Sequence, residues 1–225
     1  MTLSKEKEQE YIQKVKRNPF YLEEIETQTP EICLEAVRRH GEALQYVKEQ
    51  TYEICLEAVR ESGYALKYVK EQSHEICLEA IMQNANAIYC IKEQTHELCL
   101  EAVKENVYAI EYIREQTHEI CLEAIKRNPH IIHYIKEPTP ELYLEAVRRD
   151  GYIIADIKEQ THELCLEAIR ENAYAIEAIE NPTEALWLEA IRQNAATISF
   201  MKEPTPEFYM LAYEENPETI NYLNI

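Results

Sequence analysis

The chain of 225 residues is poor in glycine and in most aromatic residues, with 3 Gly, 3 Phe and 1 Trp. So few glycines leave little material for tight turns or flexible linkers, and no strand pattern stands out. Aspartate is also scarce, because only Asp150 and Asp156 occur among 42 acidic residues. The remaining acids are glutamate, which favours helices. These absences predict an all-α protein.

Several functional classes lack their sequence signals. No run approaches the about 20 apolar residues that cross a membrane, and the start MTLSKEKEQE has no apolar core for a signal peptide. We therefore expect a cytoplasmic location and no membrane partner. The chain has no phosphate-binding glycine loop, nucleophile elbow or HExxH motif. Carboxylate pairs such as Glu97/Glu101 recur in most copies of a repeat, which indicates a solvated face, so we expect no enzymatic activity and no cofactor.

Repetition is what the chain has in abundance. The 22-residue repeat THELCLEAVKENVYAIEYIREQ, residues 95–116, recurs along the chain without insertions, and residues 7–28 form a degenerate copy. The other restarts are Thr29, Thr51, Ser73, Thr117, Thr139, Thr161, Thr183 and Thr205. A period of this size is typical of solenoids.

Each repeat is expected to be a helical hairpin. Counting Thr95 as position 1, this residue is a good N-cap, and the first helix should end near Glu105. Asn106 is the expected hinge. Ala109, Ile110 and Ile113 then form the apolar stripe of a second helix.

The predicted fold is a right-handed α-solenoid of about ten such two-helix repeats, elongated and curved. Residues 1–28 are expected to form an N-terminal capping repeat, residues 29–204 eight regular repeats, and residues 205–225 a C-terminal capping repeat, all in one continuous domain. The basic, polar composition of residues 1–28 suits an outer cap.

Positions 22 and 5 vary together. Where position 22 is Gln, position 5 of the next repeat is Cys, as in Gln94 and Cys99; where position 22 is Pro, position 5 is a large aromatic residue, as in Pro138 and Tyr143. With Thr as N-cap, these slots are the N′ and N4 residues of a hydrophobic staple, so we interpret each proline as packing on its ring.

The seven cysteines are expected to be reduced and mostly buried. Six share position 5, and stacked helices lie about 8–10 Å apart, beyond the ~7 Å Cα limit for a disulfide. His and Cys at positions 2 and 5 resemble metal-ligand spacing, but they point to different faces and offer at most two ligands, so no metal site is expected.

The second helices carry the residues that vary while the scaffold repeats. Positions 14, 17 and 18 are expected to share one face and to align into a ribbon of tyrosines and polar groups. The candidate partner-binding residues are Tyr64, Tyr68, Tyr89, Tyr108, Tyr112, His130, His133, Tyr134, Tyr152 and Tyr174. The alternative interpretation is that these tyrosines pack between neighbouring repeats.

A glutamate at position 7 forms a second candidate surface, an acidic ladder. Its central members are Glu79, Glu101, Glu123, Glu145 and Glu167. The formal net charge of −19 already counts the Lys and Arg at positions 10 and 20. Spread over about ten repeats it amounts to about two charges per repeat, several-fold below duplex DNA. Nucleic acid is therefore not an expected partner.

The last copy departs from the pattern, since Leu211 replaces the position-7 glutamate beside Phe208 and Tyr213. One interpretation is that the closing segment, residues 221–225, covers these groups. The other is a homodimer in which Phe208, Leu211 and Tyr213 are the self-association residues.

The phrase LCLEAV at residues 98–103, with CLEA intact in six copies and followed by Asn or Gly and an apolar-Tyr pattern, resembles the repeats of the domain of unknown function 4116 family. The resemblance covers about residues 29–204 and implies a helical repeat array without an assigned activity. From the residues we expect a scaffold that binds a basic protein or peptide through the tyrosine face and the acidic surface. The alternative is an acidic inhibitor that imitates nucleic acid in the groove of an enzyme, as a phage or mobile element would use.

Overall fold

The computed structural model describes residues 3–218, which form helices and contain no β-strand. Within that range a long α-helix alternates with a six-residue 3-10 helix. The α-helices are α1 (Lys5–Arg17), α2 (Pro30–Arg39), α3 (Tyr52–Glu61), α4 (His74–Gln83), α5 (His96–Glu105), α6 (His118–Arg127), α7 (Pro140–Val147), α8 (His162–Glu171), α9 (Glu184–Gln193) and α10 (Pro206–Glu215). The 3-10 helices are η1 (Pro19–Glu24), η2 (Gly41–Tyr46), η3 (Gly63–Tyr68), η4 (Ala85–Cys90), η5 (Val107–Tyr112), η6 (Pro129–Tyr134), η7 (Gly151–Asp156), η8 (Ala173–Ala178) and η9 (Ala195–Phe200).

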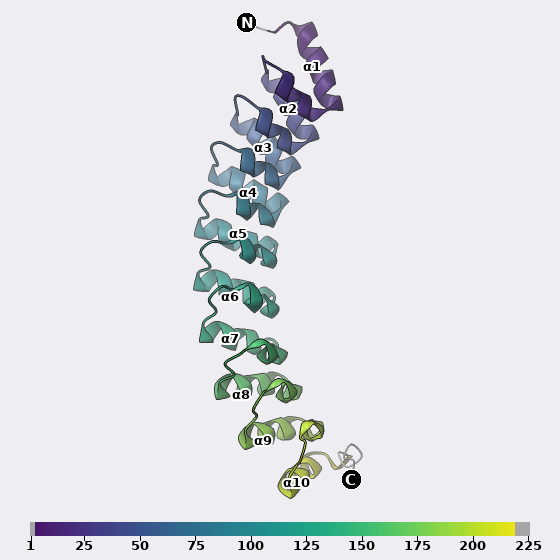
Figure 1. Ribbon diagram of the computed structural model, residues 1–225, viewed down its shortest axis with the longest axis vertical. Helices are drawn as coiled ribbons and strands as arrows, with labels where there is room; N and C mark the ends of the chain where they lie inside the picture. Colours follow the sequence, from purple (N-terminus) through teal and green to yellow (C-terminus); the bar gives the residue numbers. More distant parts are fainter. Residues whose placement is uncertain (1–2, 219–225) are drawn as a thin grey trace. The chain divides into compact units, whose positions relative to one another are not determined.

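The chain divides into two compact units, residues 1–123 and 124–225. In the first unit α1 to α5 contact one another in chain order, and so do η1 to η5 (Figure 1). In the second unit α7 to α10 and η7 to η9 do the same. Each unit is thus a helical-repeat array with a layer of α-helices and a layer of 3-10 helices, which confirms the predicted all-α repeat class. The 22-residue period runs across the boundary, so the sequence pattern does not mark it.

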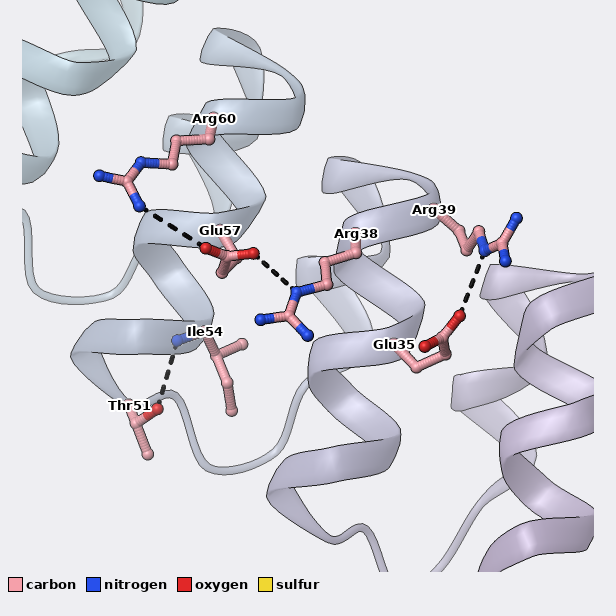
Figure 2. A network of polar contacts seen from close by, with 7 residues as sticks. All are labelled: Glu35, Arg38, Arg39, Thr51, Ile54, Glu57 and Arg60. Atoms are coloured by element: carbon pink, nitrogen blue, oxygen red, sulfur yellow. Dashed lines mark hydrogen bonds and ion pairs between the residues drawn. The ribbon is translucent and has the colours of Figure 1, made fainter.

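Threonine caps begin the α-helices at the predicted residue. Thr51 Oγ1 accepts a hydrogen bond from the Ile54 amide at 3.3 Å, as Figure 2 shows, and Thr95 does the same for Leu98. This bond satisfies one of the amides that the first turn of a helix leaves without a partner. α5 ends at Glu105, as expected.

In the repeats up to residue 204, the second helix is a 3-10 helix rather than an α-helix. In η5 the Ile113 amide bonds the carbonyl of Ile110, three residues earlier, at 3.1 Å. The Asn106 side chain caps this helix by accepting from the Tyr108 amide at 3.0 Å. A helix of six residues between a hinge and a loop is short enough for three-residue bonding, which rarely persists in longer helices.

This geometry corrects the expected face of positions 14, 17 and 18. With about three residues per turn, positions 14 and 17 lie in line, whereas position 18 is turned by about a third of a circle. The apolar stripe is as predicted, because Ala109, Ile110 and Ile113 are fully buried. Within each unit the first helices add to the core at positions 4 and 5, as Leu98 and Cys99 do in the first unit and Leu164 and Cys165 in the second.

Three glycines at position 13 bring neighbouring repeats close together. A Cβ on Gly63 would lie 2.6 Å from the carbonyl oxygen of Ala80 in the next repeat, a distance that forces a shift. The Gly63 amide instead donates to Gln83 Oε1 at 2.7 Å. Gly151 donates to Glu171 in the same way. Glycine is therefore used here for close approach of two helices.

Candidate protein-binding surface

The 3-10 layer exposes tyrosine rings in both units. In the first unit Tyr89 is 68% exposed, Tyr64, Tyr108 and Tyr112 are exposed, and Tyr68 is half-buried. In the second unit the exposed candidates are Tyr134, Tyr152, Tyr174, His130 and His133. Nine of the ten predicted partner-binding residues are thus exposed, and Tyr68 is the exception.

The aromatic side chains also contact each other between neighbouring repeats. The rings of Tyr89 and Tyr112 meet edge to face with centroids 6.0 Å apart, and Tyr174 meets Phe200 at 5.9 Å. In both pairs the second member is at position 18, which turns toward the preceding repeat. Position 18 therefore contributes a ring to both of these contacts between neighbouring 3-10 helices, while Tyr89 at position 17 and Tyr174 at position 14 remain exposed.

Polar groups in the same layer form a bridge in the first unit. Lys67 Nζ lies 3.0 Å from Glu42 Oε2, and the Tyr68 hydroxyl donates to the same oxygen at 3.3 Å. The hydrogen bond from Lys67 holds the pKa of Glu42 below its ordinary value. Lys67 also lies over the Tyr68 ring, 4.7 Å from its centroid. Glu42, Lys67 and Tyr68 are therefore engaged in contacts between repeats.

The two candidate histidines of the second unit face carboxylates of the next repeat. His130 Nε2 lies 3.0 Å from Asp150 Oδ2, and His133 Nε2 lies 3.2 Å from Asp156 Oδ2. All four side chains are partly exposed. The only two aspartates of the chain are therefore the partners of these two histidines.

The acidic ladder is joined to arginine and lysine along the α-layer. Glu57 contacts Arg38 of the preceding repeat at 2.7 Å and Arg60 of its own helix at 3.6 Å, as Figure 2 shows. Among the candidate residues, Glu79 contacts Arg60, Glu101 contacts Lys104, Glu145 contacts Arg149, and Glu167 contacts both Arg148 and Arg170. Glu123 is half-buried.

These ion pairs change what the ladder can do. Arg38, Arg60 and Arg148 each reach the position-7 glutamate of the next repeat. The side-chain hydrogen bond from Arg38 lowers the pKa of Glu57. Much of the ladder charge is therefore balanced inside the scaffold rather than presented to a partner.

Glutamine at position 22 is a structural link that the sequence reasoning missed. Gln72 Nε2 donates to the carbonyls of Leu66 and Cys90, each at 3.0 Å. Its Oε1 accepts from the Lys92 amide at 2.9 Å. Gln28, Gln94 and Gln160 make the same three bonds. The sequence signal for this link was that Gln at position 22 always occurs with Cys at position 5 of the next repeat. The structure explains the pairing, because the thiols of Cys33 and Cys55 donate to Gln28 Oε1 and Gln50 Oε1 at 3.7 Å.

Cations at position 20 have a structural role too. Lys92 Nζ donates to the carbonyls of Val69 and Lys70, and the Arg114 guanidinium donates to those of Ile91 and Lys92. These bonds satisfy backbone acceptors of the loop in the preceding repeat. The cations at position 20 therefore bind the loop backbone of the preceding repeat.

Shallow grooves lie between successive loops in each unit. One of about 570 Å³ is lined by Tyr52, Cys55, Lys70 and Gln72. Another, of about 530 Å³, is lined by Pro138 and Tyr143, so this proline and its predicted ring face the same groove.

The cysteines are free, and all except Cys90 are buried. This confirms the predicted burial at position 5. Burial raises the pKa of the Cys33 thiol to about 11 and also raises the pKa of Cys90. Across residues 3–218, no group of three His, Cys, Asp or Glu side chains is arranged to hold a metal ion.

The three self-association candidates lie in different surroundings. Phe208 is 6% exposed and packs with Ile191 and Ile198, whereas Leu211 is half-buried and Tyr213 is exposed. Phe208 is therefore a core residue. The closing segment, residues 221–225, lies outside the described part of the chain.

No helix within the described range is long and apolar enough to span a membrane.

Neither a curated protein nor a solved structure matches the chain. The family model described as Domain of unknown function (DUF4116) matches residues 29–73, 51–95 and 96–138. These overlapping tandem matches confirm the resemblance to this repeat family over residues 29–138.

Proposed function

We propose that the protein is a non-enzymatic scaffold that binds another protein through the tyrosine face of its 3-10 helices. The observation that carries the proposal is the exposure of aromatic rings at positions 14 and 17, where the repeats differ from one another. Tyr89 at position 17 and Tyr64, Tyr108, Tyr152 and Tyr174 at position 14 are exposed. Tyrosine is favoured in interfaces because it combines a large apolar ring with a polar end.

The net charge of −19 supports a basic partner. Since much of the position-7 charge is balanced by arginine, the carboxylates that reach a partner are mainly those at positions 3 and 21 and in the 3-10 layer. Glu97 at position 3 has a side chain that is 80% exposed, and Glu71 and Glu111 are exposed as well. Such charges steer association and set its salt dependence more than its strength.

The nucleic-acid imitation is the weaker proposal. An imitator presents carboxylates at phosphate-like density, about one charge per 1.7 Å for duplex DNA. Here Arg38 and Arg60 in the first unit and Arg148 in the second each bind the position-7 glutamate of the following repeat. The resulting surface alternates in sign along the α-layer, which disfavours this second function.

Cross-linking and affinity capture from the source cells, followed by mass spectrometry, would identify the partner. The full chain is compared with its Tyr89→Ala and Tyr152→Ala variants, and with Met82→Ala, which changes an exposed α-helical side chain. The proposal predicts a partner that both tyrosine variants lose and the methionine variant retains. A partner lost only on reversal of Glu79 and Glu101 to lysine, with steep salt dependence, would favour the imitator instead.

A further inference from the structure

Three consecutive repeats of the first unit form the densest part of the tyrosine face. The tyrosine row consists of Tyr64 on η3, Tyr89 on η4, and Tyr108 and Tyr112 on η5. Their exposed fractions are 39%, 68%, 47% and 37%. Each of the three 3-10 helices contacts its neighbour. The row therefore offers at least one accessible ring per repeat.

The spacing of the row selects the conformation of a bound chain. Packed helices lie about 8–10 Å apart, so a ligand that meets one ring per repeat needs equivalent side chains at that interval. A polyproline II helix has three residues per turn and rises about 3.1 Å per residue, which places every third side chain on one side about 9.3 Å apart. A β-strand covers a similar distance in three residues but turns alternate side chains to opposite faces. An α-helix repeats every ~5.4 Å.

The chemistry of the row suits proline. The edge-to-face rings of Tyr89 and Tyr112, at 73° between planes, form a corner against which a pyrrolidine ring can pack. A polyproline II backbone has no internal hydrogen bonds, so its carbonyls accept bonds from donors such as phenol hydroxyls. Asn86 occupies position 14 between Tyr64 and Tyr108, and its Oδ1 is the one buried side-chain acceptor of the described residues without a hydrogen-bond partner. A donor from a bound chain would satisfy that amide after it turns.

Charge fixes the direction of the ligand. At one end of the row, Glu42 is bound by Lys67 and Tyr68. At the other end, Glu111 is exposed on η5 and forms no ion pair within residues 3–218. A basic residue at one end of the ligand would pair with Glu111 and not with Glu42, in line with the negative net charge of the chain.

We propose that the tyrosine row binds a proline-rich segment of the form Pro-x-x-Pro-x-x-Pro, with one proline per repeat and an arginine beside Glu111. This inference rests on the proposed protein-binding function and names the class of its partner. Tyr64, Tyr89 and Tyr108 contact successive proline rings. Tyr112 supports Tyr89, and Glu111 binds the arginine.

The test uses the full chain and two fluorescent peptides of identical composition. One has prolines three residues apart and a terminal arginine; the other has prolines four residues apart. Anisotropy titration should give saturable binding of the first peptide and at least about 10-fold weaker binding of the second. Tyr89→Ala and Tyr108→Ala should each weaken the first peptide about 10-fold. Tyr52→Ala, an exposed ring on α3 outside the row, should leave it within about twofold. Glu111→Gln should weaken binding several-fold at low salt and less at high salt.

All four altered side chains are exposed, so we expect each variant to fold. Circular dichroism checks this. Equal binding of the two peptides, no saturation by about 1 mM, or an unchanged affinity for Tyr89→Ala overturns the inference. If the peptides fail while Tyr89→Ala still loses a captured protein, the ligand class is wrong and the proposed function stands. If that captured protein is also retained by the tyrosine variants, both are wrong.

Discussion

The side-chain oxygen of Gln72 accepts a hydrogen bond from the backbone amide of Lys92, 20 residues later, at 2.9 Å. The amide nitrogen of the same side chain donates to the Leu66 and Cys90 carbonyls. One glutamine thus satisfies backbone groups in two repeats, which replaces the expected apolar staple by a polar link.

Replacing this link with an apolar residue should weaken the array. Gln72→Leu leaves two carbonyls and one amide without their side-chain partner, so we expect the free energy of unfolding to fall by about 1–3 kcal/mol. Urea denaturation followed by circular dichroism measures the change. Gln45→Leu, the same change at an exposed position, should stay within about 0.5 kcal/mol. Equal effects of the two substitutions would contradict the role assigned to Gln72.

Gly63 should not tolerate even one added methyl group. The Cβ of Gly63→Ala would meet the Ala80 carbonyl at 2.6 Å, and the repeats must separate to admit it. We expect a loss of about 1–3 kcal/mol in denaturant titrations. Ser62→Ala is the neighbouring control, because the Ser62 side chain forms no capping bond. A stability gain for Gly63→Ala would show that chain entropy outweighs the contact.

Much of the fold was predictable because the decisive interactions are local. The Thr95 cap and the end of α5 at Glu105 depend on residues within a few positions. The 3-10 geometry was not predictable, since the stripe of Ala109, Ile110 and Ile113 fits an α-helix equally well. Its cause is the short span between the Asn106 cap and the following loop.

The candidate surface was predictable in its members but not in their contacts. The variable slots revealed Tyr89, yet its contact with Tyr112 of the next repeat depends on how two repeats stack. The position-7 glutamates were recognised from the sequence as an acidic ladder. The pair between Arg38 and Glu57 spans 19 residues, a separation that helical periodicity does not address.

That pair predicts a specific dependence of stability on pH. Arg38 lowers the pKa of Glu57, so its contribution is present above the ordinary glutamate value of about 4.3 and is lost as pH falls through the lowered value. A double-mutant cycle of Arg38→Met and Glu57→Gln should give a small favourable coupling at pH 7 that salt reduces, because the Arg38 side chain is exposed. Repeating the cycle in strong acid should abolish the coupling. A coupling that persists there would exclude an ionic origin.

Thiol labelling should single out one cysteine. Cys90 is half-buried and the six position-5 thiols are buried, so a maleimide should modify Cys90 first in the native protein. Burial raises the pKa of Cys90 as well, so labelling should be slow at pH 7 and faster at higher pH. Mass spectrometry of partly labelled protein identifies the site, and Cys90→Ser should remove the early product. Early modification of Cys33 would contradict the described packing.

Phe208 should behave as a core residue. Because it is buried with Ile191 and Ile198, Phe208→Ala should lower the unfolding free energy by about 3–5 kcal/mol. Tyr213→Ala, at an exposed position of the same helix, should change it far less. Thermal or urea unfolding distinguishes the two. A small effect of Phe208→Ala would instead return this ring to the set of self-association candidates.

The glutamine links have a consequence for how such a chain grows. Three bonds of each link end on main-chain groups, which nearly every residue type supplies. The thiol that the adjoining copy adds, as Cys33 does to Gln28, comes from position 5, where each repeat that follows a Gln carries Cys. An in-frame duplication of one 22-residue repeat therefore brings its own glutamine link to the next copy. The array can lengthen by gene-level copying without compensating substitutions, while its outward-facing residues diverge separately in each copy.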